Sequence, residues 1–418
     1  MQEFRFIHAA DLHIDSPFKG LKSVNPTVSK ALQEATFQAF ENLVNVCLER
    51  RVDFLLIAGD VYDGADRAPR SQLRFLNGLK KLSDAGVDAF VVHGNHDPLN
   101  GQYSRMSWPE RVHTFKEVPS WVTASRGNIP IANIQGVSYP RSSVVENLLP
   151  GFVSPPLDNL FKIGLLHCNV GGNSNHDNYA PCTVDDLCQM NMDYWALGHI
   201  HTRQTLKQAN PTIVYPGNIQ GRHPGETGPH GCVLVEVDQN GSVGTEFIEL
   251  DVVRWESIEV SIENIQGIDD LVNRITDRLV RLQSGADGRD VVCRVTLSGR
   301  GPLHGQLVGG NTISVVEEEI RLNQSQESPW IWLERLSDKT FPEIDLEHRA
   351  NQDDFLGSIL REVDGSEPDD FRELLAEVFS GRRHQLKLPE DDAQRKLLIK
   401  EWMERARWIL AEKFSVQE

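Results

Sequence analysis

Histidine and aspartate side chains gather in five short motifs in the first half of the sequence. The motifs are Asp11-Leu-His13, Gly59-Asp60, Gly94-Asn95-His96-Asp97, His167 and Gly198-His199-Ile-His201. Imidazole and carboxylate groups bind divalent cations such as Mn²⁺, Fe²⁺ and Zn²⁺ without needing a thiolate. A carboxylate such as that of Asp60 can also bridge two cations, which a neutral imidazole does not normally do. The residue types therefore predict a centre that holds two divalent metal ions.

Two-metal centres are suited to the hydrolysis of phosphoesters. The cations lower the pKa of a bridging water, neutralise the nonbridging phosphate oxygens and hold the nucleophile in line with phosphorus. The leaving alkoxide needs a proton, which a histidine held near the metals without ligating them can supply.

Spacing within the motifs supports shared ligation. Asp11 and His13 are alternate residues, which point to the same side of an extended segment and can reach one ion together. His199 and His201 have the same spacing, but a bent loop could direct them to different ions. Each motif alone is a weak signal, and it is their order along one chain that favours a metal centre.

Each motif comes at or just past the end of an apolar stretch that we expect to be a strand. These stretches are Phe4–Ala9, Asp53–Ala58, Asp88–His93, Lys162–His167 and Tyr194–Leu197. Helical patterns over 27–50 and 70–85 alternate with the strands, which is typical of an α/β layered core. Ligands of such folds bind beyond the carboxyl ends of the strands, where distant motifs converge.

The rest of the chain changes character twice. We expect a catalytic domain over 1–250, a small α+β domain over 251–338 and an acidic helical region over 339–418. Residues 391–414 are expected to form an amphipathic helix capped by Asp391 or Asp392, with Leu398, Trp402 and Ile409 on one face. That face either packs on its own domain or docks on another protein.

Composition sets limits on location and partners. The formal net charge is −18, from 60 acidic against 42 basic residues, which counts against nucleic-acid binding unless bound cations or a local basic patch compensate. The six cysteines contain no C-x-x-C pair, so we expect them to be reduced and packed. No apolar run would span a bilayer, and the N-terminus does not resemble a signal peptide, so a cytoplasmic protein without a membrane partner is expected.

Taken together, the five motifs resemble those of the calcineurin-like metallophosphoesterase superfamily. The fragments AADLHIDSPF, AGDVYD, VVHGNHD, ALGHIH and YPGNIQGRHPGETG resemble the SbcD-type DNA repair exonuclease branch, which works with a coiled-coil ATPase subunit. The likeness covers residues 1 to about 250. It implies a two-layered β-sheet core flanked by helices, followed by the small α+β cap domain and the helical C-terminal region.

The resemblance also implies roles for individual residues. The first metal would be bound by Asp11, His13, Asp60 and His201. The second would be bound by Asp60, Asn95, His167 and His199. His96 would assist the leaving group, Asp97 would orient His96 or a ligand, and both ions would be Mn²⁺.

Other residues near the motifs receive weaker expectations. Relatives from archaea and eukaryotes carry a functional histidine after G-D, whereas this sequence has Asp63, as bacterial members do, so Asp63 stays outside the catalytic set. Arg222 could contact the DNA backbone or form a surface salt bridge. His8 and His93 are expected to be packed in the core, and His176 and Asp177 to be exposed in a loop.

The leading hypothesis is a DNA repair exonuclease of 3′-to-5′ polarity that uses two metal ions and acts with the ATPase, as a homodimer by the same resemblance. A phosphoesterase for a small phosphodiester or phosphomonoester is the first alternative, which the acidic charge favours. A scaffolding subunit with a vestigial metal site is the second, against which the complete ligand set argues.

Overall fold

A computed structural model describes residues 1–16, 26–64, 69–101, 107–156, 158–172, 178–308, 310–325, 327–371 and 391–415. His176 and Asp177 of the polar loop lie outside these residues. The chain divides into two compact units. Unit 1 contains residues 1–257, 279–294 and 324–334, and unit 2 contains residues 258–278, 295–323 and 335–418.

Unit 1 is built on two six-stranded sheets. The first has the order β12-β11-β1-β2-β3-β4. Its strands are β1 (Phe4–Ala9), β2 (Phe54–Ala58), β3 (Asp88–Val92), β4 (Val112–Thr114), β11 (Gly231–Val237) and β12 (Val243–Glu249). β1 to β4 are parallel, whereas β11 pairs antiparallel with both β1 and β12. Every residue of β2 and β3 is buried, as expected for strands covered on both faces.

The second sheet has the order β5-β6-β7-β8-β10-β9. Its strands are β5 (Ser120–Arg126), β6 (Ile129–Gly136), β7 (Phe161–His167), β8 (Tyr194–Gly198), β9 (Gln204–Lys207) and β10 (Thr212–Tyr215). β6, β7, β8 and β10 are parallel. The carboxyl ends of both parallel sets carry the predicted motifs.

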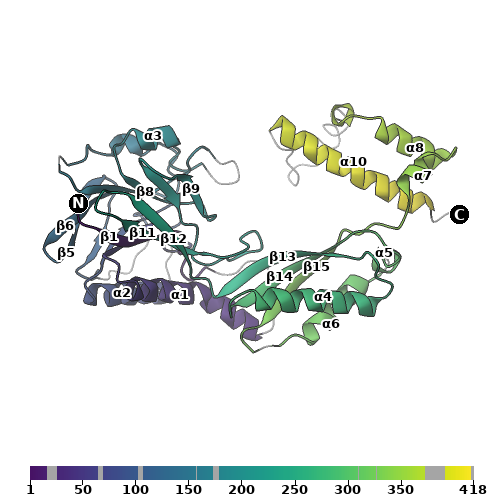
Figure 1. Cartoon of the computed structure of the whole chain (residues 1–418), viewed down its shortest axis with the longest axis horizontal. Coiled ribbons are helices and arrows are strands. Elements are labelled where there is room, and N and C mark those ends of the chain that lie inside the picture. Colours follow the sequence, from purple (N-terminus) through teal and green to yellow (C-terminus); the bar gives the residue numbers. More distant parts are fainter. Residues whose placement is uncertain are drawn as a thin grey trace. The chain divides into compact units, whose positions relative to one another are not determined.

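Apolar side chains fill the space between the sheets and cover their outer faces. Phe54 and Phe90 of the first sheet share one buried cluster with Tyr194 of the second. Helices α1 (Pro26–Glu49) and α2 (Pro69–Asp84) pack Phe40 and Phe75 on the other face of the first sheet. The short helices η1 (Leu149–Gly151) and α3 (Val184–Cys188) cover the second (Figure 1). The predicted α/β fold, with two sheets between helices, is confirmed.

A third sheet follows in the order β13-β14-β15. Its strands are β13 (Val253–Ser261), β14 (Asp290–Ser298) and β15 (Ile331–Asp338), and the helices nearby in sequence are α4 (Ile268–Ser284), α5 (His304–Val308) and α6 (Thr312–Leu322). In unit 1, Trp255 and Trp330 pack with Val28 and Leu32 of α1. These tryptophans are buried, so they serve as core residues.

Unit 2 ends in helices, and one of them buries a different face from the one predicted. They are α7 (Leu346–Ala350), α8 (Phe355–Asp364), η2 (Pro368–Phe371) and α10 (Asp392–Ser415). Asp391 caps α10 by accepting a hydrogen bond from the backbone N–H of Gln394 at 2.8 Å. The buried face of α10 carries Ile399, Trp408 and Ala411, whereas Ile409 of the predicted face is 44% exposed. The predicted face was wrong because apolar residues occur on several sides of this helix.

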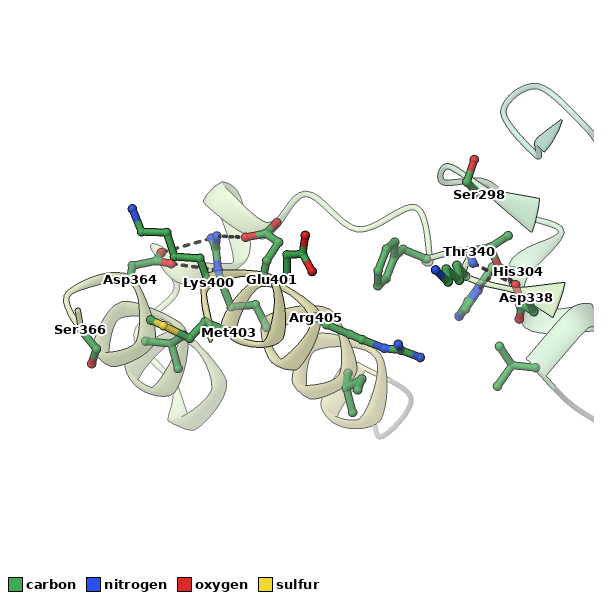
Figure 2. Close-up of a pocket in the computed structure, with 17 residues that line it drawn as sticks. Ser298, His304, Asp338, Thr340, Asp364, Ser366, Lys400, Glu401, Met403 and Arg405 are labelled. Atoms are coloured by element: carbon green, nitrogen blue, oxygen red, sulfur yellow. Dashed lines mark hydrogen bonds and ion pairs between the residues drawn. The ribbon is translucent and has the colours of Figure 1, made fainter. Parts of the chain in front are cut away.

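A pocket of about 850 Å³ lies within unit 2 beside α10 (Figure 2). Its lining includes His304, whose Nδ1 lies 2.8 Å from the Thr340 hydroxyl. Thr340 in turn donates to Asp338 at 2.7 Å. Across the described residues of the chain, no helix is both long and apolar enough to cross a bilayer.

Candidate metal centre

The loops after the parallel strands hold unusual backbone conformations at four predicted metal ligands. The φ angles of Asp11, His13, Asp60 and His199 are 51°, 42°, 49° and 101°. Such left-handed angles are uncommon outside glycine and persist where surrounding contacts enforce them. The backbone N–H of Asp11 donates to Gly59 O at 3.1 Å, and that of His13 donates to Asp60 O at 3.0 Å. The first two loops are thereby locked to each other.

Gly198 permits the two sheets to approach at this edge. A Cβ atom on Gly198 would lie 1.9 Å from the carbonyl oxygen of Ala58, closer than any side chain tolerates. His167 makes a second link across the same gap, since its Nδ1 donates to that carbonyl at 2.9 Å. Because Nδ1 is turned to this carbonyl, Nε2 of His167 faces the predicted metal centre.

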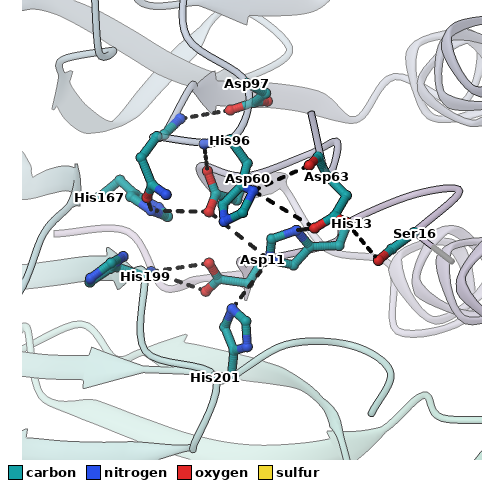
Figure 3. A network of polar contacts seen from close by, with 12 residues as sticks. Asp11, His13, Ser16, Asp60, Asp63, His96, Asp97, His167, His199 and His201 are labelled. Carbon is teal, nitrogen blue, oxygen red and sulfur yellow. Dashed lines mark hydrogen bonds and ion pairs between the residues drawn. The ribbon is translucent and has the colours of Figure 1, made fainter. Parts of the chain in front are cut away.

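Ligand atoms of Asp11, His13 and His201 lie within 4.8 Å of one another and form a first pocket (Figure 3). Nε2 of His13 and Nε2 of His201 are 3.2 Å apart, so both rings turn the same nitrogen to one point. The Asp60 carboxylate lies 4.0 Å from Nε2 of His13. The four residues assigned to the first metal are thus brought together.

Asp11, Asp60 and His167 form a second group by the same distance criterion. Nε2 of His167 lies 3.4 Å from Oδ2 of Asp60 and 3.0 Å from Oδ1 of Asn95. His199 donates its backbone N–H to Asp11 at 3.1 Å, and its ring lies edge-on to that of His167 with centroids 5.2 Å apart. Asp60 therefore lies between the two pockets, as a bridging carboxylate must.

His96 and Asp97 differ sharply in exposure. The side chain of His96 is 42% exposed, with Nδ1 lying 3.2 Å from the carbonyl oxygen of Asp63. Asp97 is fully buried and accepts hydrogen bonds from the backbone N–H groups of Gly94 at 2.7 Å and Val61 at 3.0 Å, and from His93 at 3.0 Å. Asp97 was placed in the catalytic set as the residue that orients His96 or a ligand, and its hydrogen bonds fix the loop that carries Asn95 and His96.

Burial and neighbouring charges shift the pKa values of several side chains where the strands end. Burial raises the pKa of the Asp11 carboxyl to about 6. Burial would also raise the pKa of Asp60, but the neighbouring His167 holds it well below its ordinary value. Burial alone would lower the pKa of His167, yet the carboxylates of Asp60 and Asp11 raise it to about 9. A metal ion that binds His167 must therefore displace a proton.

The donor set fits divalent cations. It consists of two carboxylates, one amide oxygen and four imidazoles, a mixture that suits borderline-to-hard metals. When bound, the metals would supply an activated water and a positive charge against phosphate.

Comparisons with known proteins agree with this chemistry. Residues 4–203 match the calcineurin-like phosphoesterase family, and residues 255–340 match the middle domain of the metallophosphoesterase YhaO. An uncharacterized metallophosphoesterase, YhaO of Bacillus subtilis, is 34% identical over 100% of this chain and 99% of its own length. The chain belongs to the calcineurin-like metallophosphoesterase family.

More distant relatives of this metallophosphoesterase carry a more specific name. The DNA double-strand break repair protein Mre11 of Methanopyrus kandleri is 27% identical over 63% of this chain. Mre11 of Sulfurisphaera tokodaii is 22% identical over 64% of it. These matches span 60% and 68% of the respective relatives. Family membership makes the chain a phosphoester hydrolase that uses divalent metals.

Arg222 of the metallophosphoesterase is not an exposed surface residue whose charge is available to DNA. Its side chain is 12% exposed, and its guanidinium donates to Asp63 at 2.9 Å and to Ser16 at 3.0 Å. A charge already paired with a carboxylate is poorly available to a phosphate. The sequence-based prediction of substrate contact therefore lacks support from the geometry.

Two carboxylates in this region were given no role in the site by the sequence analysis. Glu226 lies 2.6 Å from Nδ1 of His201, and Asp63 lies 3.2 Å from Nδ1 of His13. Burial would raise the pKa of Glu226, but His201, His223 and Arg222 hold it well below its ordinary value. Asp63 was noted after Asp60 but was left outside the catalytic set. Glu226 gave no signal in the sequence, because it contacts His201 of a different loop.

Proposed function

We propose that the chain is a Mn²⁺-dependent exonuclease of DNA repair. It would remove nucleotides in the 3′-to-5′ direction. The observation that carries the proposal is the position of Asp60 between two clusters of ligands, within 3.4 Å of His167 and 4.0 Å of His13. Two cations sharing one carboxylate can stabilise both oxygens of an in-line displacement. The similarity to two Mre11 proteins supports DNA as the substrate.

Each residue of the centre has a distinct task in this proposal. Asp11, His13 and His201 would hold the first cation, whereas Asn95, His167 and His199 would hold the second, and Asp60 would be shared by the two sets. The Nδ1 proton of His96 is donated to the carbonyl of Asp63, so Nε2 is the atom that can deliver a proton to the leaving oxygen. Its exposure at the rim gives a long substrate access to that atom.

A small phosphoester remains the competing substrate, and the net charge of −18 is the observation that favours it. A highly acidic protein repels a polyanion unless cations intervene. A compact phosphomonoester or cyclic nucleotide would meet less of this repulsion. The two substrates use the same metals, so only turnover can distinguish them.

The decisive experiment compares linear duplex DNA with bis-p-nitrophenyl phosphate, both in Mn²⁺. DNA carrying a label at the 5′ end should yield a ladder of shortened strands, since removal from the 3′ end leaves the label on the strand. Release of a single labelled nucleotide would reverse the polarity, and cleavage of the small ester alone would replace the nuclease proposal. Addition of a chelator is the control and should stop both reactions.

The proposed partners can be tested separately. By family resemblance, residues 251–338 cap the site and guide DNA, residues 339–418 dock on a coiled-coil ATPase subunit, and the chain pairs as a homodimer. Light scattering of the purified chain measures its oligomeric state. Co-purification with a coiled-coil ATPase, with and without residues 339–418, tests the docking role.

A further inference from the structure

Arg222 lies between two carboxylates that each hold a histidine of the first pocket. The three residues come from loops far apart in the sequence, after β2 and after β10. Two of the three had no expected role, and the third was expected to contact DNA. Their contacts form a continuous path from one metal-facing ring to the other.

The path begins at His201. Its Nε2 faces Nε2 of His13 at 3.2 Å, so its Nδ1 points away from the pocket. There it meets Oε1 of Glu226 at 2.6 Å, and the Glu226 side chain is only 6% exposed. A carboxylate on the outer nitrogen fixes both the proton position and the orientation of a metal-binding imidazole.

His13 also has a carboxylate on its outer side, but the contact is one of charge and proximity without hydrogen-bond geometry. Its Nδ1 lies 3.2 Å from Oδ1 of Asp63, again on the side away from the pocket. The other oxygen of Asp63 accepts a hydrogen bond from the Ser16 hydroxyl at 3.0 Å. Asp63 is thereby fixed by the loop that follows β1, and it fixes the ring of His13 in turn.

Arg222 joins the two halves. Its guanidinium donates to Oδ1 of Asp63 at 2.9 Å and lies 3.7 Å from Oε1 of Glu226. Its backbone N–H donates to the other oxygen of Glu226 at 2.7 Å. One arginine therefore neutralises two carboxylates that would otherwise repel each other, with a rigid fork that a lysine cannot reproduce.

We propose that Arg222 is a positioning residue of the first metal pocket, acting through Asp63 and Glu226 on the rings of His13 and His201. The inference rests on the proposed two-metal function and assigns these three residues a place in it. Arg222 determines how well the first cation is held, and the second pocket, built on His167 and Asn95, is independent of it.

A Mn²⁺ titration by calorimetry tests this assignment with the full-length chain. Arg222→Met removes the charge and keeps the length of the side chain. It should weaken one of two Mn²⁺ equivalents about 10- to 100-fold, the range for loss of partners that orient a ligand. Arg222→Lys keeps the charge without the fork and should recover part of that loss.

Two further variants keep the test independent of folding. Glu226→Gln preserves side-chain shape and should weaken the same single equivalent by a similar factor. Arg126→Met removes a matched arginine–carboxylate pair, with Asp53, at the other end of the strands, and should leave both equivalents unchanged. Circular dichroism establishes which variants are folded before titration.

The outcomes separate the inference from the function on which it rests. Unchanged Mn²⁺ binding in folded Arg222→Met and Glu226→Gln, together with a raised KM for DNA in the former, would make Arg222 a substrate contact and overturn the inference alone. A wild-type chain that takes up no Mn²⁺ would contradict the proposed two-metal function itself.

Discussion

The parallel strands have very different surroundings at their amino ends and at their carboxyl ends. We call these two sides of the sheets the amino edge and the carboxyl edge. At the amino edge, Arg126 pairs with Asp53 through two hydrogen bonds of 2.6 and 2.8 Å and links the two sheets. The Arg126 side chain is 45% exposed and that of Asp53 is 8% exposed, so water screens the pair from the side of the arginine. At the carboxyl edge, His167 links the sheets through Ala58, and the carboxylates beside it are almost completely buried.

The contrast shows that charged residues alone do not mark a site. Both edges carry acids and bases, but at the carboxyl edge Asp11 and Asp60 are almost completely buried on a left-handed backbone and lie among several histidines. Burying charge costs free energy unless a partner compensates. The carboxyl edge therefore offers grouped acids and imidazoles that suit divalent cations, whereas the amino edge carries an arginine–carboxylate pair.

The largest effect should come from the bridging carboxylate. Asp60→Asn keeps the shape of the side chain but removes the charge shared by both pockets. We expect metal-dependent hydrolysis to fall by roughly 10³-fold or more. Turnover of bis-p-nitrophenyl phosphate in Mn²⁺ measures the loss, and activity within tenfold of the wild type would contradict the bridging role.

A smaller loss is expected at the exposed rim. His96→Ala should reduce turnover by about 10²-fold, because the leaving oxygen loses its proton donor, while Mn²⁺ binding stays near the wild-type level. Paired titration and rate measurements check this split. Hydrolysis at the wild-type rate would show that His96 is not the proton donor.

A buried histidine between the two edges gives a pH-dependent prediction. Burial lowers the pKa of His8 from 6.5 to about 3, and its ring contacts the Tyr194 hydroxyl and the Leu197 carbonyl. Between these pH values the unfolded chain binds a proton that the folded chain does not. The stabilising contribution is thus complete above pH 6.5 and falls as the pH drops toward 3, by about 1.4 kcal/mol per pH unit.

Urea unfolding of the wild type and His8→Gln from pH 7 to pH 4 isolates this contribution. The difference in free energy of unfolding between the two proteins should shrink as the pH falls. If this difference in free energy of unfolding stayed constant with pH, His8 would not be neutral in the folded protein. Such a result would contradict the lowered pKa that its burial implies.

The smallest effect should be at the amino edge. Arg126→Gln breaks a partly exposed pair and leaves Asp53 its hydrogen bond from the backbone N–H of Arg5, so the free energy of unfolding should change by about 1 kcal/mol and hydrolysis should not change. Urea midpoints and the same ester assay suffice. A large loss of activity would contradict the view that hydrolysis depends on the carboxyl edge and not on the amino edge.

The convergence of the five motifs could be predicted because parallel strands place their carboxyl ends at one edge, whatever their order in the sheet. The pairing of β1 with β11 could not, since contacts between distant segments leave no local period. Glu226 was missed for the same reason, as its partner His201 belongs to another loop. The buried face of α10 was mispredicted because Leu398 and Ile399 are equally apolar and only tertiary contacts choose between them.

The place of β1 in the first sheet has a consequence for biosynthesis. β1 lies between β2 and β11, and it forms antiparallel pairs with residues 233–237. A nascent chain can assemble β1, β2 and β3 early, but one side of β1 keeps unpaired backbone groups until β11 leaves the ribosome. The loop with Arg222 and Glu226 emerges just ahead of that strand. The first pocket therefore cannot be completed before the segment from Arg222 to Val237 has been synthesised.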